Sequence, residues 1–137
     1  MKRDQLMDLA KEMLDKAYVP YSKFPVGAAV VTKSGKVYQG CNIENAAYPV
    51  SCCAERVAIF KAVSEGERDF EQLAVIANTD RPVAPCGSCR QVMAEFFSPD
   101  TPIHMANRTG DIEETILERL LPYSFNTTDL ESGQSKK

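Results

Sequence analysis

Residues 53–56 read Cys-Ala-Glu-Arg, and residues 85–90 read Pro-Cys-Gly-Ser-Cys-Arg. The two stretches offer one carboxylate and three thiolates, those of Glu55, Cys53, Cys86 and Cys89. A structural zinc site normally has four protein ligands, whereas a catalytic zinc keeps three and leaves a position open for water. The spacing therefore predicts a catalytic zinc centre held by cysteines, with Glu55 placed to move the protons of that water.

The two stretches lie where a loop or strand gives way to an expected helix. At such a place the backbone N–H groups and the positive helix end favour ionised thiols. Residues two apart on a regular helix point to nearly opposite sides, so Cys53 and Glu55 can converge only if Cys53 is at the cap or first position of its helix. Cys86 and Cys89 are three apart and can share one face.

Three thiolates around a dication give a negative centre, which weakens its effect on the pKa of bound water. A guanidinium that donates hydrogen bonds to sulfur would offset this charge. Arg56 follows Cys53 by three residues and Arg90 follows Cys89 directly, and we favour Arg56 for this role. The alternatives are that each arginine lies on a solvated helix face and that Glu55 is only a first-turn acid favoured by the helix dipole.

The remaining cysteines and the single histidine carry other expectations. Cys52 as a fourth ligand would close an all-cysteine structural centre, but neighbouring side chains diverge and chelate poorly together. Cys41 is expected to be a small buried strand residue. His104 lies in an apolar strand and is expected to be structural, with no acid–base role.

Chain length and composition limit the class of protein. The 137 residues favour one domain, for which we expect the bounds 1–129, followed by a polar, flexible tail over 130–137. No run is apolar enough for a signal core or a bilayer span, so no membrane partner is expected. An odd count of five cysteines fits a reducing compartment, and we expect the cytoplasm.

The charge balance bears on the substrate. A net charge of −3 argues against a partner bound through many phosphates, because that mode requires clustered lysine and arginine. We therefore expect a small, weakly charged substrate and no nucleic acid.

Hydrophobic spacing predicts the order of elements. The expected helices are residues 3–17, 54–63, 86–97 and 112–121, and the expected strands are residues 26–32, 37–41, 73–77 and 103–106. The strands at 26–32 and 37–41 are joined by a Ser-Gly hairpin turn. This order predicts an α/β fold in which helices cover a mixed sheet, with parallel crossovers in its second half.

Three further motifs accompany the cysteine stretches: Pro-Tyr-Ser-Lys-Phe at 20–24, Gly-Cys-Asn-Ile-Glu-Asn-Ala-Ala-Tyr at 40–48, and Leu-Leu-Pro-Tyr-Ser-Phe at 120–125. With them the chain resembles the cytidine deaminases of the small, three-cysteine class that form homotetramers. The resemblance extends from Leu6 to Phe125. It implies a three-layer α/β/α fold with a five-stranded mixed sheet.

The resemblance also implies a role for individual residues. It places one Zn²⁺ per subunit on Cys53, Cys86 and Cys89, with Glu55 as proton shuttle. It assigns the nucleoside contacts to the Phe24 ring, to the Asn42 and Glu44 side chains at the sugar 3′-hydroxyl, to the backbone of Ala46 and Ala54 at the pyrimidine edge, and to Tyr48 and Phe125 from a neighbouring subunit.

The implied reaction is the zinc-dependent hydrolysis of cytidine or deoxycytidine to uridine or deoxyuridine plus ammonia, as in pyrimidine salvage. Three rivals remain at this stage. A deaminase of aminonucleoside antibiotics would share the zinc motif, although the Asn42 and Glu44 pair argues against it. A non-catalytic zinc module would require four protein ligands. A polynucleotide deaminase is disfavoured by the net charge.

Overall fold

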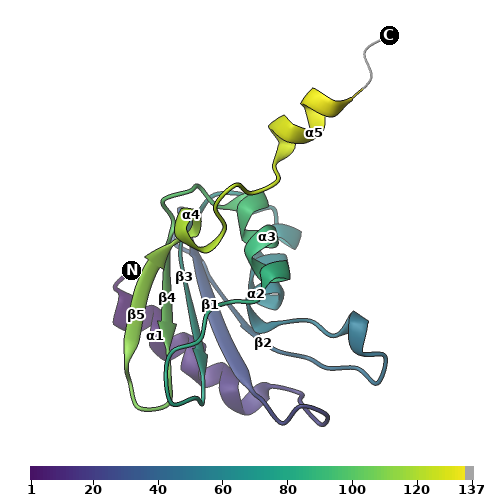
Figure 1. Ribbon diagram of the computed structural model, residues 1–137. Helices are drawn as coiled ribbons and strands as arrows, with labels where there is room; N and C mark the ends of the chain where they lie inside the picture. Colours follow the sequence, from purple (N-terminus) through teal and green to yellow (C-terminus); the bar gives the residue numbers. More distant parts are fainter. Residues whose placement is uncertain (135–137) are drawn as a thin grey trace.

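The structure, a computed structural model, describes residues 1–134. Its centre is a five-stranded mixed sheet in the order β2-β1-β3-β4-β5. Helix α1 covers one face, and α2 and α3 cover the other (Figure 1). The strands are β1 (Val26–Thr32), β2 (Val37–Cys41), β3 (Phe70–Ala77), β4 (Pro102–Ala106) and β5 (Ile112–Ile116). The helices are α1 (Arg3–Glu12), α2 (Ala54–Ser64), α3 (Gly87–Phe96), α4 (Leu117–Leu120) and α5 (Thr127–Gly133), with short 3₁₀ turns at Met13–Lys16 and Tyr48–Val50.

The predicted α/β fold of three layers with a five-stranded mixed sheet is confirmed. β1 and β2 form the expected antiparallel hairpin, in which Gly35 adopts a φ of 90° and donates its amide to the Thr32 carbonyl at 2.9 Å. β3 and β4 are parallel and are joined through α3, as βαβ connections are. The neighbouring pairs on either side, β1–β3 and β4–β5, are antiparallel.

The prediction of one helix over 112–121 is wrong. Residues Ile112–Ile116 form β5 and pair antiparallel with β4, and only Leu117–Leu120 are helical. The turn after β4 is the cause, since Gly110 has a φ of 90° and donates its amide to the Asn107 carbonyl at 3.3 Å. The chain therefore returns along the free edge of β4, and backbone hydrogen bonds override the helical spacing of the apolar residues.

Two hydrophobic cores lie on the two faces of the sheet. Alternate residues of β1 face opposite ways, so that Ala28 and Val30 face α2 and α3 while Ala29 and Val31 face α1. Every one of these side chains is buried. The core under α2 and α3 is the larger one, and it holds the first turns of both helices against the sheet.

The C-terminal segment leaves the body of the molecule (Figure 1). It forms α5, whose cap is a reciprocal pair in which Asn126 and Asp129 exchange side-chain to backbone hydrogen bonds of 3.2 and 3.0 Å. This helix crosses the domain boundary expected at residue 129, which stays a prediction, and residues 135–137 of the expected tail lie outside the described residues. Within residues 1–134, no helix has the length and apolar character that crossing a membrane requires.

Candidate metal centre and active site

The first turns of α2 and α3 bring three sulfur atoms together. Cys53 is the N-cap of α2, Cys86 is the N-cap of α3, and Cys89 is in the first turn of α3. The Sγ atoms all lie within 4.8 Å of one another, with 3.7 Å between Cys53 and Cys86 and 3.5 Å between Cys86 and Cys89. A tetrahedron with metal–sulfur bonds of about 2.3 Å has sulfur–sulfur edges of about 3.8 Å. The donor set and its spacing therefore fit zinc.

The cap position of Cys53 is the one that the sequence required. Its backbone is extended, with φ −72° and ψ 154°, so its side chain leaves the helix on the same side as that of Glu55. Gly40 of β2 makes this placement possible. A Cβ at Gly40 would collide with the backbone of Ala54 and Ala58. Only glycine lets the first turn of α2 approach the sheet so closely.

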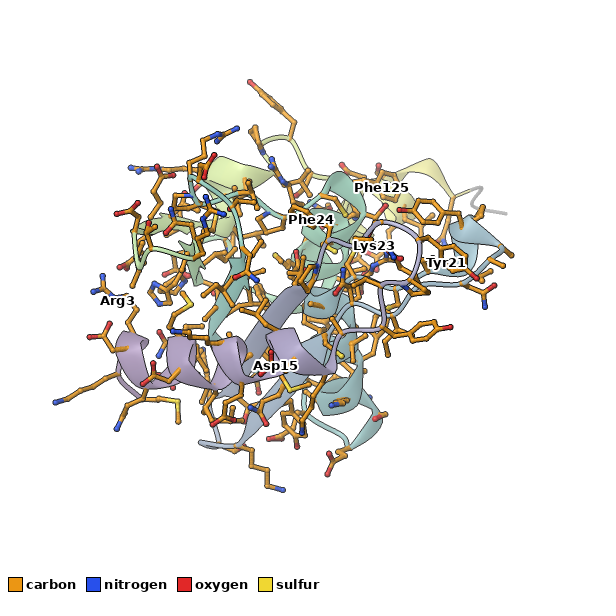
Figure 2. The ribbon with its side chains drawn as sticks, turned by 90° about the horizontal axis from the view of Figure 1, so that it is seen from below. Arg3, Asp15, Tyr21, Lys23, Phe24 and Phe125 are labelled. Carbon is orange, nitrogen blue, oxygen red and sulfur yellow. The ribbon has the colours of Figure 1, made fainter. Side chains whose placement is uncertain are left out.

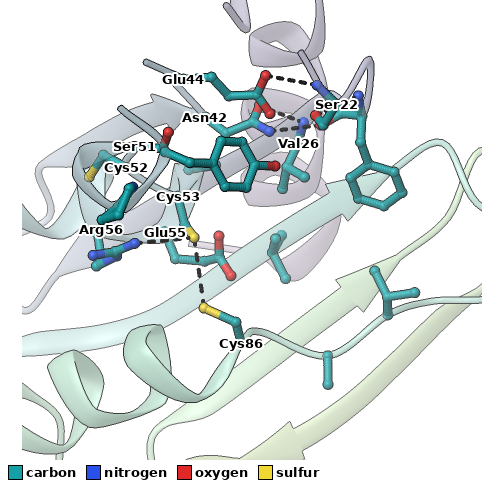
Figure 3. A pocket seen from close by; sticks show the side chains of 17 residues that line it. Ser22, Val26, Asn42, Glu44, Ser51, Cys52, Cys53, Glu55, Arg56 and Cys86 are labelled. Atoms are coloured by element: carbon teal, nitrogen blue, oxygen red, sulfur yellow. Dashed lines mark hydrogen bonds between the residues drawn. The ribbon is translucent and has the colours of Figure 1, made fainter. Parts of the chain in front are cut away.

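Two arginines near the sulfur atoms have different contacts. Arg56 Nη2 donates to Cys53 Sγ at 3.4 Å (Figure 3). Arg90 instead donates to two carbonyl oxygens, that of Pro85 at 2.7 Å and that of Leu120 at 2.8 Å. Arg56 is thus the guanidinium beside the sulfur, while Arg90 joins the loop before Cys86 to the last residue of α4.

The sulfur atoms differ in their protonation. Hydrogen bonds lower the pKa of Cys53 to about 5. The bond from Cys89 has the largest effect, and those from Arg56 and Cys86 have smaller ones. The pKa of Cys89 is raised, because its thiol donates to Cys53 and is also buried. One ionised sulfur is therefore already stabilised by the protein alone, and it is the one next to Arg56.

Glu55 has only 5% of its surface exposed. Burial, and to a lesser extent the charge of Cys53, raises the pKa of the Glu55 carboxyl to about 7. A carboxyl group that titrates near neutrality can both accept and release a proton during one reaction cycle. The carboxylate lies beside the sulfur atoms of Cys53 and Cys86 (Figure 3).

The sulfur cluster and Glu55 lie at a cavity of about 540 Å³. The cavity is lined by Ser22, Phe24, Val26, Asn42, Glu44, Tyr48, Pro49, Ser51, Cys52, Cys53, Ala54, Glu55, Arg56, Val75, Val83, Ala84 and Cys86 (Figure 3). Its walls are largely apolar, with charged groups at two places only: around the sulfur cluster and at Glu44. This is the form of a small-molecule site.

The polar end of the cavity is formed by the segment that follows β2. Ile43 is bridged to Tyr18 on one side and to Cys52 on the other, so residues 42–44 form the middle of three short extended segments. Successive side chains alternate, and Asn42 and Glu44 therefore both face the cavity while Ile43 points away. The bridge to Cys52 fixes how far these two side chains lie from Cys53.

The structure brings most of the predicted site residues to this cavity but not all of them. Cys89 lies in the sulfur cluster behind the cavity wall. Ala46 is exposed and does not line the cavity, and Phe125 is 58% exposed and does not line it either. Tyr48 lines the cavity of its own chain.

Sequence reasoning missed several wall residues, namely Ser22, Val26, Pro49, Ser51, Val75, Val83 and Ala84. Val83 and Ala84 could have been found from their position directly before the Pro85-Cys86 motif. Val75 carries no such signal, because it reads as an ordinary residue of a buried strand. It becomes a cavity residue only through the packing of the sheet with the helices and loops that form the other walls.

The other titratable residues lie outside the cluster. Cys52 is not part of the sulfur group of the described chain, and burial raises the pKa of its thiol. Cys41 is buried and its Sγ donates to the Lys16 carbonyl at 3.4 Å. His104 is buried outside the cavity and its Nε2 is 2.7 Å from Gln72 Oε1, an arrangement that fits the expected structural role.

Comparison with known proteins places this site in a family. The profile of the cytidine and deoxycytidylate deaminase zinc-binding region matches residues 1–105. The chain is 54% identical over 130 residues to the cytidine deaminase of Sporosarcina psychrophila, and the aligned residues cover 95% of this chain and 96% of that protein. It is 52% identical over 130 residues to the cytidine deaminase of Halalkalibacterium halodurans, covering 95% and 98%.

The fold agrees with these relatives. The crystal structure of cytidine deaminase from Burkholderia pseudomallei superimposes with a TM-score of 0.89 at 47% sequence identity, covering 91% of this chain and 100% of that one. With a shared fold, a three-sulfur cluster that fits zinc and about half of its residues in common with these proteins, the chain belongs to the cytidine and deoxycytidylate deaminase family.

Proposed function

We propose that this chain hydrolyses cytidine and deoxycytidine to uridine and deoxyuridine with release of ammonia, as an enzyme of pyrimidine salvage. The observation that carries the proposal is the position of Glu55, buried beside the sulfur cluster at the wall of a cavity of about 540 Å³. A four-ligand structural zinc site would have no need of a buried carboxylate that titrates near neutrality.

Cys53, Cys86 and Cys89 are the proposed zinc ligands. Zinc bound there would act as a Lewis acid. It would lower the pKa of water toward about 7, so that the water can lose a proton at neutral pH. Arg56 is the proposed second contact of the Cys53 sulfur. Its hydrogen bond withdraws electron density from the sulfur and limits the loss of Lewis acidity that three thiolates cause.

Glu55 is the proposed carrier of both protons of the attacking water. It accepts the first proton and delivers it to N3 of the pyrimidine, which makes C4 electrophilic while the water oxygen bonds to C4. It then delivers the second proton to the exocyclic amine. The C4–N bond breaks, ammonia leaves with three hydrogen atoms, and the product retains the proton on N3, so atoms and charge balance.

The polar end of the cavity is the proposed sugar site. Asn42 and Glu44 offer an amide and a carboxylate that can fix one hydroxyl as donor and acceptor. Phe24 is the proposed apolar contact of the nucleoside. Backbone groups of Ala46 and Ala54 are the proposed contacts of the pyrimidine edge, and the position of Ala54 on the cavity wall supports its part of this assignment.

A homotetramer with pockets shared between subunits is the proposed assembly. Exposed aromatic side chains support it: Phe24 and Tyr48 line the cavity, and Tyr18, Tyr21 and Phe125 are exposed outside it (Figure 2). Phe125 lies outside its own cavity at the start of the projecting segment, and Gln91 holds its carbonyl at 2.9 Å. We propose that Phe125 completes the cavity of a neighbouring subunit; Tyr48, expected there as well, instead lines the cavity of its own chain. The absence of disulfides among the described cysteines supports the cytoplasm as the compartment.

One assay tests the activity. The purified zinc-loaded protein is followed by ultraviolet absorbance with cytidine, deoxycytidine, cytidine 5′-monophosphate and blasticidin S. We expect turnover of the first two. Turnover of blasticidin S alone would replace the proposed substrate class, and zinc binding without turnover of any of the four would favour a non-catalytic module. Light scattering of the same sample tests the tetramer.

A further inference from the structure

The loop of residues 78–86, which connects β3 to α3, carries part of the cavity wall. Val83 and Ala84 line the cavity, and Cys86 at the end of the loop holds one of the three sulfur atoms. Residues 78–85 belong to no helix or strand. The position of this wall therefore depends on the contacts that hold the loop.

The two ends of this loop are held by different side chains. At the α3 end, Arg90 donates to the Pro85 carbonyl at 2.7 Å. At the β3 end, Asn107 Nδ2 donates to the Asp80 carbonyl at 2.9 Å. Arg108 also contacts the Asp80 carboxylate, but both of these side chains are exposed, and exposed ion pairs contribute little. Among the described residues, Asn107 is thus the main polar contact at the β3 end of the loop.

The topology of the sheet explains why Asn107 reaches this loop. β3 and β4 are adjacent and parallel, with Ile76 opposite Ala106, so both strands leave the sheet at the same end (Figure 1). Asn107 is the first residue after β4 and lies in the turn to β5. It therefore meets the loop after β3 although 27 positions separate it from Asp80 in the sequence.

The side-chain amide of Asn107 uses all of its hydrogen-bonding groups. The residue is 1% exposed. Its Oδ1 accepts from the backbone N–H of Thr109 at 3.2 Å and of Asp111 at 2.9 Å, and these bonds close the turn. Its Nδ2 donates to the Asp111 carboxylate at 3.0 Å and, with its second proton, to the Asp80 carbonyl. A buried amide with a partner for every donor is held in one orientation, and only its bond to Asp80 leaves the turn.

We propose that Asn107 is a positioning residue of the nucleoside cavity, which holds the Asp80 carbonyl and through it the cavity wall at residues 83–84. The inference rests on the proposed function and adds a residue to it. Pro82, between Asp80 and the wall, is buried and has a fixed φ, so a shift at Asp80 moves the wall. Asn107 itself lies neither at this cavity nor in the sulfur cluster, so it acts on substrate binding only through the loop.

The test exchanges two side chains of the turn in the double variant Asn107→Asp/Asp111→Asn. The carboxylate at position 107 still accepts from the two backbone N–H groups, and the amide at position 111 donates back across the turn. The Thr109 hydroxyl contacts both side chains and can serve either one as donor or acceptor. The exchange keeps the net charge and the bonds within the turn. It removes the one donor to the Asp80 carbonyl.

Loss of this bond predicts a rise of about 2- to 10-fold in the KM for cytidine in the exchanged variant, with kcat and zinc content unchanged. The kcat is unchanged because α2 and α3 position Glu55 and the cysteine ligands. The inhibition constant of uridine, which occupies the same cavity without reacting, should rise by the same factor.

Asp111→Ala is the matched control. It removes a bond within the turn but leaves the bond from Asn107 to Asp80, so the KM should stay within about twofold of the wild type while the melting temperature falls. Asn107→Ser is the second test variant. Its shorter side chain can accept the N–H bonds of the turn but does not extend to the Asp80 carbonyl, so it should raise the KM as the exchange does.

The outcomes are separable. A wild-type KM and a wild-type inhibition constant of uridine in the exchanged variant, or in Asn107→Ser if the exchanged variant does not fold, would overturn the role of Asn107 and leave the proposed function standing. An equal rise in KM in Asp111→Ala would do the same, because the stability of the turn would then account for the effect. A zinc-loaded wild type that turns over no nucleoside would overturn both proposals.

Discussion

The two ends of the cavity are built in different ways. At the metal end, Cys53, Glu55 and Cys86 are caps and first-turn residues of α2 and α3, and helical geometry sets their spacing. At the other end, the proposed sugar site, Asn42 and Glu44 lie on a short irregular segment and are oriented by hydrogen bonds to a loop about twenty residues earlier. Local helix geometry therefore positions the residues of the metal end, whereas tertiary contacts position Asn42 and Glu44.

The two buried carboxylates show the same difference in their electrostatics. Burial raises the pKa of Glu55 to about 7, which suits a group that gains and loses protons. Hydrogen bonds from Ser22 and Tyr21 lower the pKa of Glu44, which suits a permanently charged acceptor. Two glutamates at one cavity thus have two roles because one is short of hydrogen-bond donors and the other is surrounded by them.

The largest expected effect is at the metal end. Cys53→Ser should lose zinc and all measurable activity, because a serine hydroxyl is not ionised at neutral pH and is a poor zinc ligand. Cys52→Ser should keep both, since Cys52 lies outside the sulfur cluster. Metal content by mass spectrometry, with turnover of cytidine, checks the pair. Loss of zinc from Cys52→Ser instead would reverse the assignment.

Glu55→Gln should retain zinc and the fold but lose about three orders of magnitude or more in kcat, because an amide cannot carry protons between water, N3 and the amine. Steady-state kinetics and metal analysis of one preparation measure both quantities. Glu44→Gln is the matched variant at the sugar end, and its loss should be mainly in KM. A Glu55→Gln enzyme within tenfold of the wild type would rule out the proton carrier.

Arg56→Gln should lower kcat/KM about tenfold to a hundredfold, since it removes the donor to the Cys53 sulfur. Arg90→Gln serves as its control, because Arg90 bonds carbonyl groups and not sulfur. We expect Arg90→Gln to lower the melting temperature more than the activity. Equal kinetics for Arg56→Gln and the wild type would leave Arg56 with a packing role only.

Phe125→Ala should raise the KM for cytidine about 2- to 10-fold, the value of one aromatic contact, with zinc content and tetramer mass unchanged. Mixing tests whether the contact crosses a subunit boundary. Inactive Glu55→Gln subunits retain Phe125 and can donate it to a Phe125→Ala neighbour with an intact Glu55. Reassembled mixtures that show no gain over Phe125→Ala alone would contradict a shared pocket.

The smallest effect concerns His104, outside the cavity. Burial lowers the pKa of His104, and Glu114 at 3.6 Å opposes this only in part. The folded state thus binds fewer protons than the unfolded chain just below the ordinary pKa of about 6.5, so stability is present above that pH and falls as the pH drops through it. His104→Asn should lack this part of the pH dependence. Urea unfolding of both proteins between pH 5 and 8 measures the difference in slope, and parallel curves would contradict it.

Several features followed from the sequence because they depend on neighbours along the chain. The cap position of Cys53 follows from the need of Cys53 and Glu55 to converge, and the β1–β2 hairpin follows from alternating apolar residues around a Ser-Gly turn. The helix predicted for residues 112–116 was wrong because this segment depends on a partner that is distant in the sequence. Its apolar spacing suits a helix, and only the open edge of β4 makes it a strand.

At the site the same division holds. The sulfur donors and the carboxylate beside them could be predicted from residue types and spacing, since a thiol or carboxyl keeps its chemistry in any fold and helical geometry sets its spacing. The three-dimensional packing was needed to show that Val75 becomes a cavity wall and that the backbone N–H groups of Tyr21 and Ser22 bind the Glu44 carboxylate. These contacts join segments far apart in the chain, so they form only once the sheet and helices have brought the partners together, to within about 3 Å for a hydrogen bond.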